Sequence, residues 1–139
     1  MADLLTCGEV ARRCGVSPDT VRYYERLGLV PPAQRTQAGY RQYPDSTCRR
    51  VLVVRAALRV GLTLRQLGAV FTVRDRGALP CHEVRRLADA RLVQVEEELR
   101  ELFRSRRLIK AVLRDWDVRL AQVRPGQPAH LLEALLAED

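Results

Sequence analysis

The sequence has no long hydrophobic run and few of the residues from which enzymes build active sites. No apolar stretch approaches the ~18 residues of a membrane-spanning helix. The N-terminal MADLLTCGEV also lacks the basic region and apolar core of a signal peptide. We therefore expect a cytoplasmic protein with no membrane partner. With two histidines, and without a carboxylate pair, a Ser/His/Asp set or a phosphate-cradling glycine loop, the chain is not expected to be an enzyme.

The cysteines are not spaced as in a disulfide framework. The four cysteines stand at positions 7, 14, 48 and 81, with no CxxC and no repeated spacing. In a chain without a secretion signal, this pattern argues against structural disulfides. Cys7 and Cys14 lie among apolar neighbours and are predicted to act as small buried hydrophobic residues. Cys48 is predicted to lie on a helix.

The positive charge is confined to one half of the chain. Residues 1–76 hold 13 arginines against six acidic residues, whereas residues 77–139 hold 11 basic and 11 acidic residues. The whole net charge of +7 therefore belongs to the first half. This asymmetry favours a polyanionic partner for the first half and a different task for the second.

Capping signals near the N-terminus predict two short helices. Thr6 and Glu9 form a capping box for a helix that ends near Gly15. Ser17 then caps a second helix, with Pro18 at its first position, and Gly28 ends it. Two such helices joined by a short turn predict a helix-turn-helix, whose second helix offers its first residues to the DNA major groove.

A small wing is predicted after the second helix. Residues 35–43 hold a Thr-Gln-Ala-Gly turn between extended arms, which indicates a two-stranded hairpin. Arginines can neutralise phosphates, and tyrosines can donate to phosphates or stack on sugars. An alternative is that the tyrosines form hairpin core, which we expect for at least one of them. The candidate DNA-binding residues are Pro18, Asp19, Thr20, Arg22, Tyr23, Arg35, Gly39, Tyr40, Arg41 and Tyr43.

The segment GEVARRCGVSPDTVRYYERLGLVPPAQRTQAGYRQY resembles the signature of the MerR family of winged-helix transcription regulators. The match runs over roughly residues 4–76 and includes RYYE at 22–25 and GYR at 39–41. The resemblance implies a regulator that binds a palindromic promoter and represses in one state. In another state it would activate by bending and untwisting the DNA, so that RNA polymerase is affected indirectly.

Further helices are predicted behind the wing. Asp45 is expected to cap a helix that runs to Val60, and Thr63 opens another through a capping box with Gln66. Four arginines of the first of these helices, at positions 49, 50, 55 and 59, are compatible with either solvent or backbone contacts. We expect a DNA-binding domain over 1–76, a hinge over 77–79, a dimerisation helix over 80–122 and a C-terminal loop and short helix over 123–139.

A heptad pattern predicts that the long helix has a partner. From Ala88 to Leu120 apolar residues recur at alternating spacings of four and three, interrupted once by Arg106. This pattern is typical of a coiled coil, and a homodimer is the simplest partner. The family resemblance implies an antiparallel pairing. The candidate dimerisation residues are Leu92, Val95, Leu99, Leu102, Ile109, Leu113 and Trp116.

The C-terminal region leaves the effector open. The small metal- and thiol-sensing branch of the family carries a cysteine at the start of the long helix, which Cys81 matches, and two more around the C-terminal loop. The two loop positions fall near Leu120 and Ala129, which argues against thiolate metal sensing. A substitute zinc site between subunits, from Cys81 or His82 and His130, is one hypothesis. A redox or electrophile sensor at Cys81 is another, and a helix-start cysteine with two exposed histidines is a third.

The overall prediction is a mainly α protein. It combines a winged helix-turn-helix with a long dimerisation helix and a short C-terminal helix. Its predicted function is that of a dimeric DNA-binding transcription regulator. The alternatives are a coiled-coil interaction module whose basic head binds protein or RNA, and a regulator that has lost metal sensing.

Overall fold

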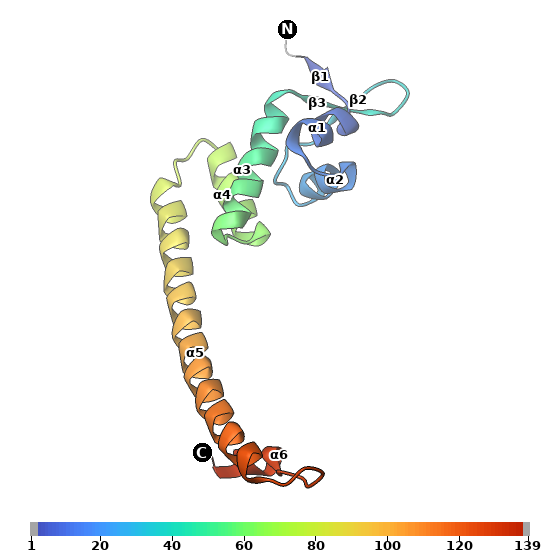
Figure 1. Ribbon diagram of the computed structural model, residues 1–139. Coiled ribbons are helices and arrows are strands. Elements are labelled where there is room, and N and C mark those ends of the chain that lie inside the picture. Colours follow the sequence, from blue (N-terminus) through green and yellow to red (C-terminus); the bar gives the residue numbers. More distant parts are fainter. Residues whose placement is uncertain (1–2, 138–139) are drawn as a thin grey trace. The chain divides into compact units, whose positions relative to one another are not determined.

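The computed structural model describes residues 3–137 and is mainly helical, as predicted (Figure 1). Among the described residues, no helix is both long and apolar enough to cross a membrane. The helices are α1 (Cys7–Cys14), α2 (Pro18–Arg26), α3 (Ser46–Val60), α4 (Leu64–Asp75), α5 (Cys81–Gln122) and α6 (Leu131–Ala134), followed by the 3-10 turn η1 (Leu135–Ala137). We call the part from the first strand to the end of α4 the head.

A small antiparallel sheet lies in the head. Strand β3 (Arg41–Pro44) is central, between β1 (Leu4–Leu5) and β2 (Gln34–Arg35). Leu5 pairs with Tyr43 on one side of β3, and Arg35 pairs with Arg41 on the other. The loop between β2 and β3 projects beyond the sheet and forms the predicted wing (Figure 1). Strand β1 was not predicted, because two residues are too few to show an alternating pattern.

The predicted helix caps are confirmed at α1, α2 and α4. Thr6 and Glu9 form the capping box of α1, and Thr63 and Gln66 form that of α4. Ser17 caps α2, and Gly15 takes the left-handed conformation that ends α1, with φ of 67°. The first two helices therefore begin and end where the sequence predicts.

Asp45 corrects one prediction about caps. It occupies the N-cap position of α3 but makes no side-chain cap hydrogen bond. Its φ of −59° and ψ of −28° are already helical, whereas a capping side chain needs an extended backbone to reach the next turn. In the C-terminal region, where a short helix was predicted within residues 123–139, α6 ends at Ala134 and a 3-10 turn follows.

The core of the head lies where α1 to α4 meet the sheet. Apolar burial is the main term that stabilises such a small unit. Val10 of α1, Val21 of α2 and Val51 of α3 are fully buried. The cluster continues with Leu5, Ala11, Cys14, Tyr24, Leu29, Val30, Tyr43, Val54, Leu62, Leu67 and Phe71. Its side chains hold α2 and the wing on one support.

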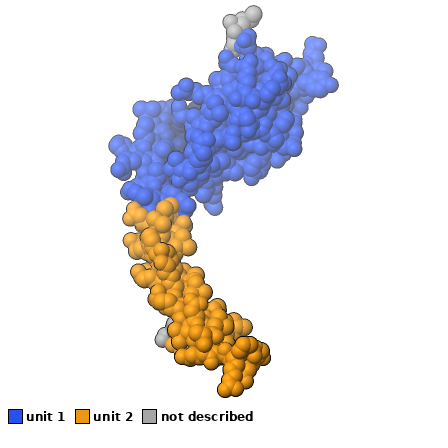
Figure 2. Space-filling model, in the orientation of Figure 1, with its two compact units in different colours: residues 1–92 blue, residues 93–139 orange. Residues whose placement is uncertain are grey.

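The chain divides into two compact units after Leu92, coloured separately in Figure 2. The first unit includes the start of α5, because Leu87 packs against the head core. The side chain of Arg91 also lies against Gly61, close enough that a Cβ there would meet its Nε at 2.6 Å. The beginning of the long helix is therefore part of the head's packing.

Candidate nucleic-acid interface

Helix α2 begins with a cap that fixes its first turn and leaves it exposed. The Ser17 hydroxyl accepts a hydrogen bond from the Thr20 N–H at 3.1 Å and lies 2.9 Å from the Thr20 hydroxyl. Pro18 occupies the first turn and is exposed, as is Asp19. The Asp19 carboxylate accepts a hydrogen bond from Arg22 one turn later. The start of α2 thus presents short polar side chains on a rigid support.

The turn between α1 and α2 is secured from α3. Arg55 donates from Nη1 to the carbonyl of Cys14 at 2.8 Å and to that of Gly15 at 3.2 Å. These carbonyls belong to the end of α1, where no further helical N–H can satisfy them. Arg55 is therefore a structural residue of the helix-turn-helix.

The wing turn is closed by its own hydrogen bonds. The Thr36 hydroxyl accepts from the Tyr40 N–H at 3.1 Å, and Arg35 donates to the Gly39 carbonyl at 2.8 Å. Gly39 has φ of 85°, a left-handed conformation that favours glycine. Tyr40 is 73% exposed at this turn. The wing therefore holds one arginine and one tyrosine at its tip.

Glu25 joins the base of the wing to α2. Its carboxylate accepts hydrogen bonds from the Tyr43 hydroxyl at 2.6 Å and from the Ala33 N–H at 2.9 Å, and Arg41 Nε lies 3.4 Å away. Burial opposes ionisation of Glu25, but these hydrogen bonds and the Arg41 charge outweigh it and lower its pKa. Burial, and then the Glu25 contact, raises the pKa of Tyr43 well above its usual value.

Arg41 and Tyr43 consequently differ in their availability to a ligand. Arg41 Nε is buried and has no hydrogen-bond partner among residues 3–137, so its only compensation there is the ion pair with Glu25. Its side chain as a whole is 35% exposed. Tyr43 is fully buried. We therefore leave Tyr43 out of the candidate contact surface. It is a hairpin-core tyrosine, as the sequence predicted for at least one of the tyrosines between positions 23 and 43.

Three arginines meet the start of α1 around one cavity. The cavity has a volume of about 310 Å³. Helix α1 contributes its N-terminus, whose first N–H groups have no intrahelical acceptor and carry the positive end of the helix dipole. Its lining residues are Thr6, Cys7, Gly8, Arg22, Arg35, Gly39, Tyr40 and Arg41. We call this cavity the anion seat, because guanidinium groups and a helix N-terminus both favour phosphate oxygens.

Most of the predicted DNA-binding residues lie at or beside the anion seat. Tyr23 is 42% exposed, one turn after the start of α2, and the Arg26 guanidinium lies 5.7 Å from its ring centre. The exposed members of the predicted set are Pro18, Asp19, Tyr23, Arg35, Gly39 and Tyr40, and the half-buried ones are Thr20, Arg22 and Arg41. Cys7 and the N-terminus of α1 were missed, because a capping box signals a helix start and not a ligand.

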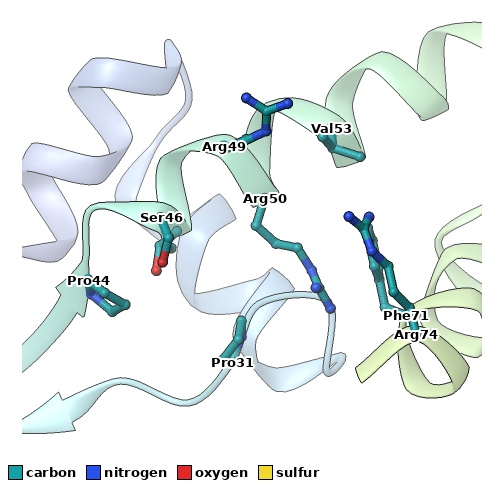
Figure 3. Close-up of a pocket in the computed structure, with 9 residues that line it drawn as sticks. Pro31, Pro44, Ser46, Arg49, Arg50, Val53, Phe71 and Arg74 are labelled. Carbon is teal, nitrogen blue, oxygen red and sulfur yellow. The ribbon is translucent and has the colours of Figure 1, made fainter. Parts of the chain in front are cut away.

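Arg50 is a second arginine that the sequence left unassigned. It donates from Nε to the Leu29 carbonyl at 2.7 Å and makes two hydrogen bonds to Asp75, at 3.1 and 2.9 Å. Its guanidinium lies 3.6 Å from the Phe71 ring centre. Figure 3 shows Arg50 reaching from α3 beside Phe71 in a cleft of about 250 Å³. Arg50 therefore ties α3 and α4 to the loop after α2.

Comparison with known families gives this arrangement a context. The model of the MerR family regulatory proteins matches residues 6–43, and that of the MerR DNA-binding region matches residues 48–112. The mercuric resistance operon regulatory protein of Bacillus cereus is 33% identical over 102 residues, 73% of this chain and 77% of the relative. The chain belongs to the MerR family. It is a DNA-binding transcription regulator, and its relatives are regulators, not enzymes.

Two further relatives are similar to this chain over most of its length. The regulator ZntR of Escherichia coli K12 is 33% identical over 96 residues, 68% of each protein. The crystal structure of PbrR691 from Ralstonia metallidurans CH34 with lead(II) has a TM-score of 0.77 and 28% identity. The match covers 94% of this chain and 98% of that one. The similarity thus extends through the long helix and beyond.

The predicted dimerisation stripe is present on the surface of α5 in this MerR-family chain. No described residue of α5 is buried in the single chain. The exposed members of the stripe are Leu92, Leu99, Leu102, Ile109 and Leu113, and Val95 and Trp116 are half-exposed. A 42-residue helix with an uncovered apolar stripe is compatible with a coiled coil.

The candidate metal-binding residues are all exposed. Cys81 is an exposed free thiol, and His82 follows it in the first turn of α5. His130 precedes α6 in a left-handed conformation, with Nδ1 4.0 Å from the Glu133 carboxylate. Within residues 3–137, no three His, Cys, Asp or Glu side chains are grouped to hold a metal ion.

Proposed function

We propose that the head binds duplex DNA through the anion seat and the first turn of α2. The main support for this proposal is that Arg22, Arg35 and Arg41 line one cavity with the N-terminus of α1, beside the exposed start of α2. Phosphates seated there would position the protein without reading sequence. Pro18, Asp19, Thr20 and Tyr23 would then approach base edges in the major groove.

The protein would act as an antiparallel coiled-coil homodimer. Between residues 93 and 103, α5 carries four glutamates and one arginine, and between 104 and 114 it carries four arginines, one lysine and no acid. An antiparallel partner would place each acidic segment near the basic segment of the other helix, whereas parallel helices would align like charges. The charge pattern thus supports the orientation that the family resemblance implies.

A two-fold dimer would present two heads to a palindromic promoter. A helix of 42 residues is roughly 60 Å long, so α5 would set the distance between the heads and hence between the half-sites. We propose that one state of the dimer bends and untwists the intervening DNA. RNA polymerase would then be affected indirectly, through promoter geometry.

The effector we propose is a metal ion bound between the subunits. Relatives support this, since PbrR691 was crystallised with lead(II) and the Bacillus cereus relative regulates mercuric resistance. Cys81 or His82 of one subunit with His130 of the other would supply the nitrogen and sulfur donors that zinc accepts. The cysteine-free segment from residue 82 to 139 supports the alternative of a regulator that no longer senses metal.

Selection of DNA from a random duplex pool tests the proposed function. The full chain should enrich inverted repeats, and a permuted-site gel assay should show a bend centred between the half-sites. Weak binding with no preference for inverted repeats would instead support a coiled-coil interaction module with a basic head. An Arg124→Ala variant removes one charge from the C-terminal loop, outside the head and the heptad stripe, and should select the same repeats.

A further inference from the structure

Two thiols lie together in the head and have no part in the proposed DNA surface. Cys14 ends α1, and Cys48 lies in the first turn of α3, 34 residues later. The Cys14 thiol donates a hydrogen bond to the Cys48 carbonyl at 3.4 Å. Neither cysteine is in a disulfide. Their proximity comes from the fold, because no short sequence motif links them.

The two thiols differ in their access to solvent. Cys14 is 4% exposed, whereas Cys48 is half-buried. Burial, and then the neighbouring Cys48 thiol, raises the pKa of Cys14 to about 11, although the nearby charge of Arg55 opposes this. Cys14 is therefore a protonated, enclosed thiol at neutral pH. A small reagent would meet Cys48 first.

The segment between the two thiols is the reading part of the head. It contains α2, β2, the wing turn and the whole of β3, and so it holds every predicted DNA-binding residue from Pro18 to Tyr43. A bond between Cys14 and Cys48 would close this segment into a covalent loop. None of the residues that line the anion seat would take part in this bond, since neither thiol belongs to that cavity.

We propose that Cys14 and Cys48 form an oxidisable thiol pair whose reagents are small hydroperoxides. The Cys48 sulfur attacks a peroxide oxygen and the O–O bond breaks, which leaves a sulfenic acid on Cys48, while the proton of the Cys48 thiol goes to the departing oxygen to give water or an alcohol. The Cys14 sulfur then attacks the Cys48 sulfur. The S–S bond forms, and the departing hydroxyl leaves with the Cys14 proton as water. Two thiols are oxidised by two electrons, and one peroxide is reduced.

The disulfide would stabilise the head without blocking DNA. Closing a loop of about 35 residues lowers the entropy of the unfolded chain, which favours the folded state. We expect the melting temperature to rise by at least about 5 °C. Affinity for random duplex DNA should stay within about twofold, because the arginines of the anion seat remain in place.

The test uses the full chain with Cys81→Ser, which removes the exposed thiol and its intermolecular disulfides. After hydrogen peroxide, peptide mapping should find the Cys14 and Cys48 peptides joined, with a loss of about 2 Da. The melting temperature should rise and return after reduction. Cys7→Ser is a matched control in the head, and it should keep both effects.

Cys48→Ser should abolish the joined peptide and the rise in melting temperature, and its half-buried position makes it better tolerated than a change at Cys14. Three results would overturn the proposal. The first is that Cys14 and Cys48 both stay open to alkylation under denaturing conditions after peroxide treatment. The second is a joined peptide that contains Cys7 in place of either cysteine. The third is an oxidised protein that melts at the same or a lower temperature than the reduced one.

Discussion

The hydroxyl of Tyr43 donates a 2.6 Å hydrogen bond to the carboxylate of Glu25. This bond joins the central strand of the sheet to the last turn of α2, and both residues are shielded from solvent. Arg41 of the wing approaches the same carboxylate from the anion seat. The position of the wing relative to α2 therefore depends on one half-buried acid.

Removing the Tyr43 hydroxyl should weaken the head. Tyr43→Phe keeps the ring in the core but deletes a hydrogen bond to a charged acceptor, so we expect a loss of about 1.5–3 kcal/mol in unfolding free energy. Urea denaturation of the full chain measures this. Tyr40→Phe removes the same atom from an exposed ring and should change stability by less than about 0.5 kcal/mol. Equal losses in both variants would contradict the role of Glu25.

Glu25 also predicts how the head responds to acid. Its pKa is lowered in the folded state from an ordinary value of 4.5. A depressed pKa contributes stability above the unfolded value, and that contribution is lost as pH falls through the folded value. Unfolding free energy should therefore fall as the pH drops below about 4.5. Glu25→Gln should be less stable near neutral pH and should show a shallower fall. An unchanged slope in this variant would rule out Glu25 as a source of acid sensitivity.

The arginines of the anion seat should contribute equally to specific and random DNA. Arg35→Ala should weaken both and reduce the slope of log affinity against log salt by about one unit. Arg41→Ala should do the same but also destabilise the head, because Arg41 compensates the charge of the half-buried Glu25. Arg124→Ala, which removes the same charge from the C-terminal loop, should leave the slope unchanged. Unaltered affinity in Arg35→Ala would remove the wing from the DNA surface.

The sequence was sufficient for the elements that depend on local chemistry. Capping side chains at Thr6, Ser17 and Thr63 predicted where three helices begin, because a cap acts within four residues. It was insufficient for arginines whose partners are distant in the chain. Arg50 meets Asp75 and Arg55 meets Cys14, at separations of 25 and 41 residues. The local sequence around an arginine does not distinguish a side chain exposed to solvent from one that donates to a backbone carbonyl.

The wing shows the same limit within one motif. Tyr40 and Tyr43 stand three residues apart, and both were predicted to contact DNA. Tyr40 lies at the turn and is exposed, whereas Tyr43 lies on the central strand and is buried. The Tyr43 side chain packs in the core of the head and donates to Glu25 of α2. The sequence indicated that at least one tyrosine is core but not which one, because that depends on contacts with residues distant in the chain.

Zinc should bind the dimer if the proposed effector site exists. Native mass spectrometry of the zinc-treated full chain should then show two ions per dimer, since a two-fold axis duplicates the site. A chelator should remove them, and Cys81→Ser should prevent binding, whereas Cys7→Ser should bind normally. The melting temperature should rise with zinc in the same variants. An apo mass in every condition would favour a regulator without metal sensing.

Disrupting the stripe of α5 should separate the subunits. Leu99 lies on the predicted stripe and Leu108 does not, although the two are similarly exposed in the single chain, at 47% and 51%. Leu99→Asp would place a charge in the seam of both helices, where it has no water and no partner. Sedimentation at micromolar concentration should show a dimer for the parent and for Leu108→Asp, and a monomer for Leu99→Asp. A monomeric parent, or a dimeric Leu99→Asp, would show that this stripe does not join the subunits.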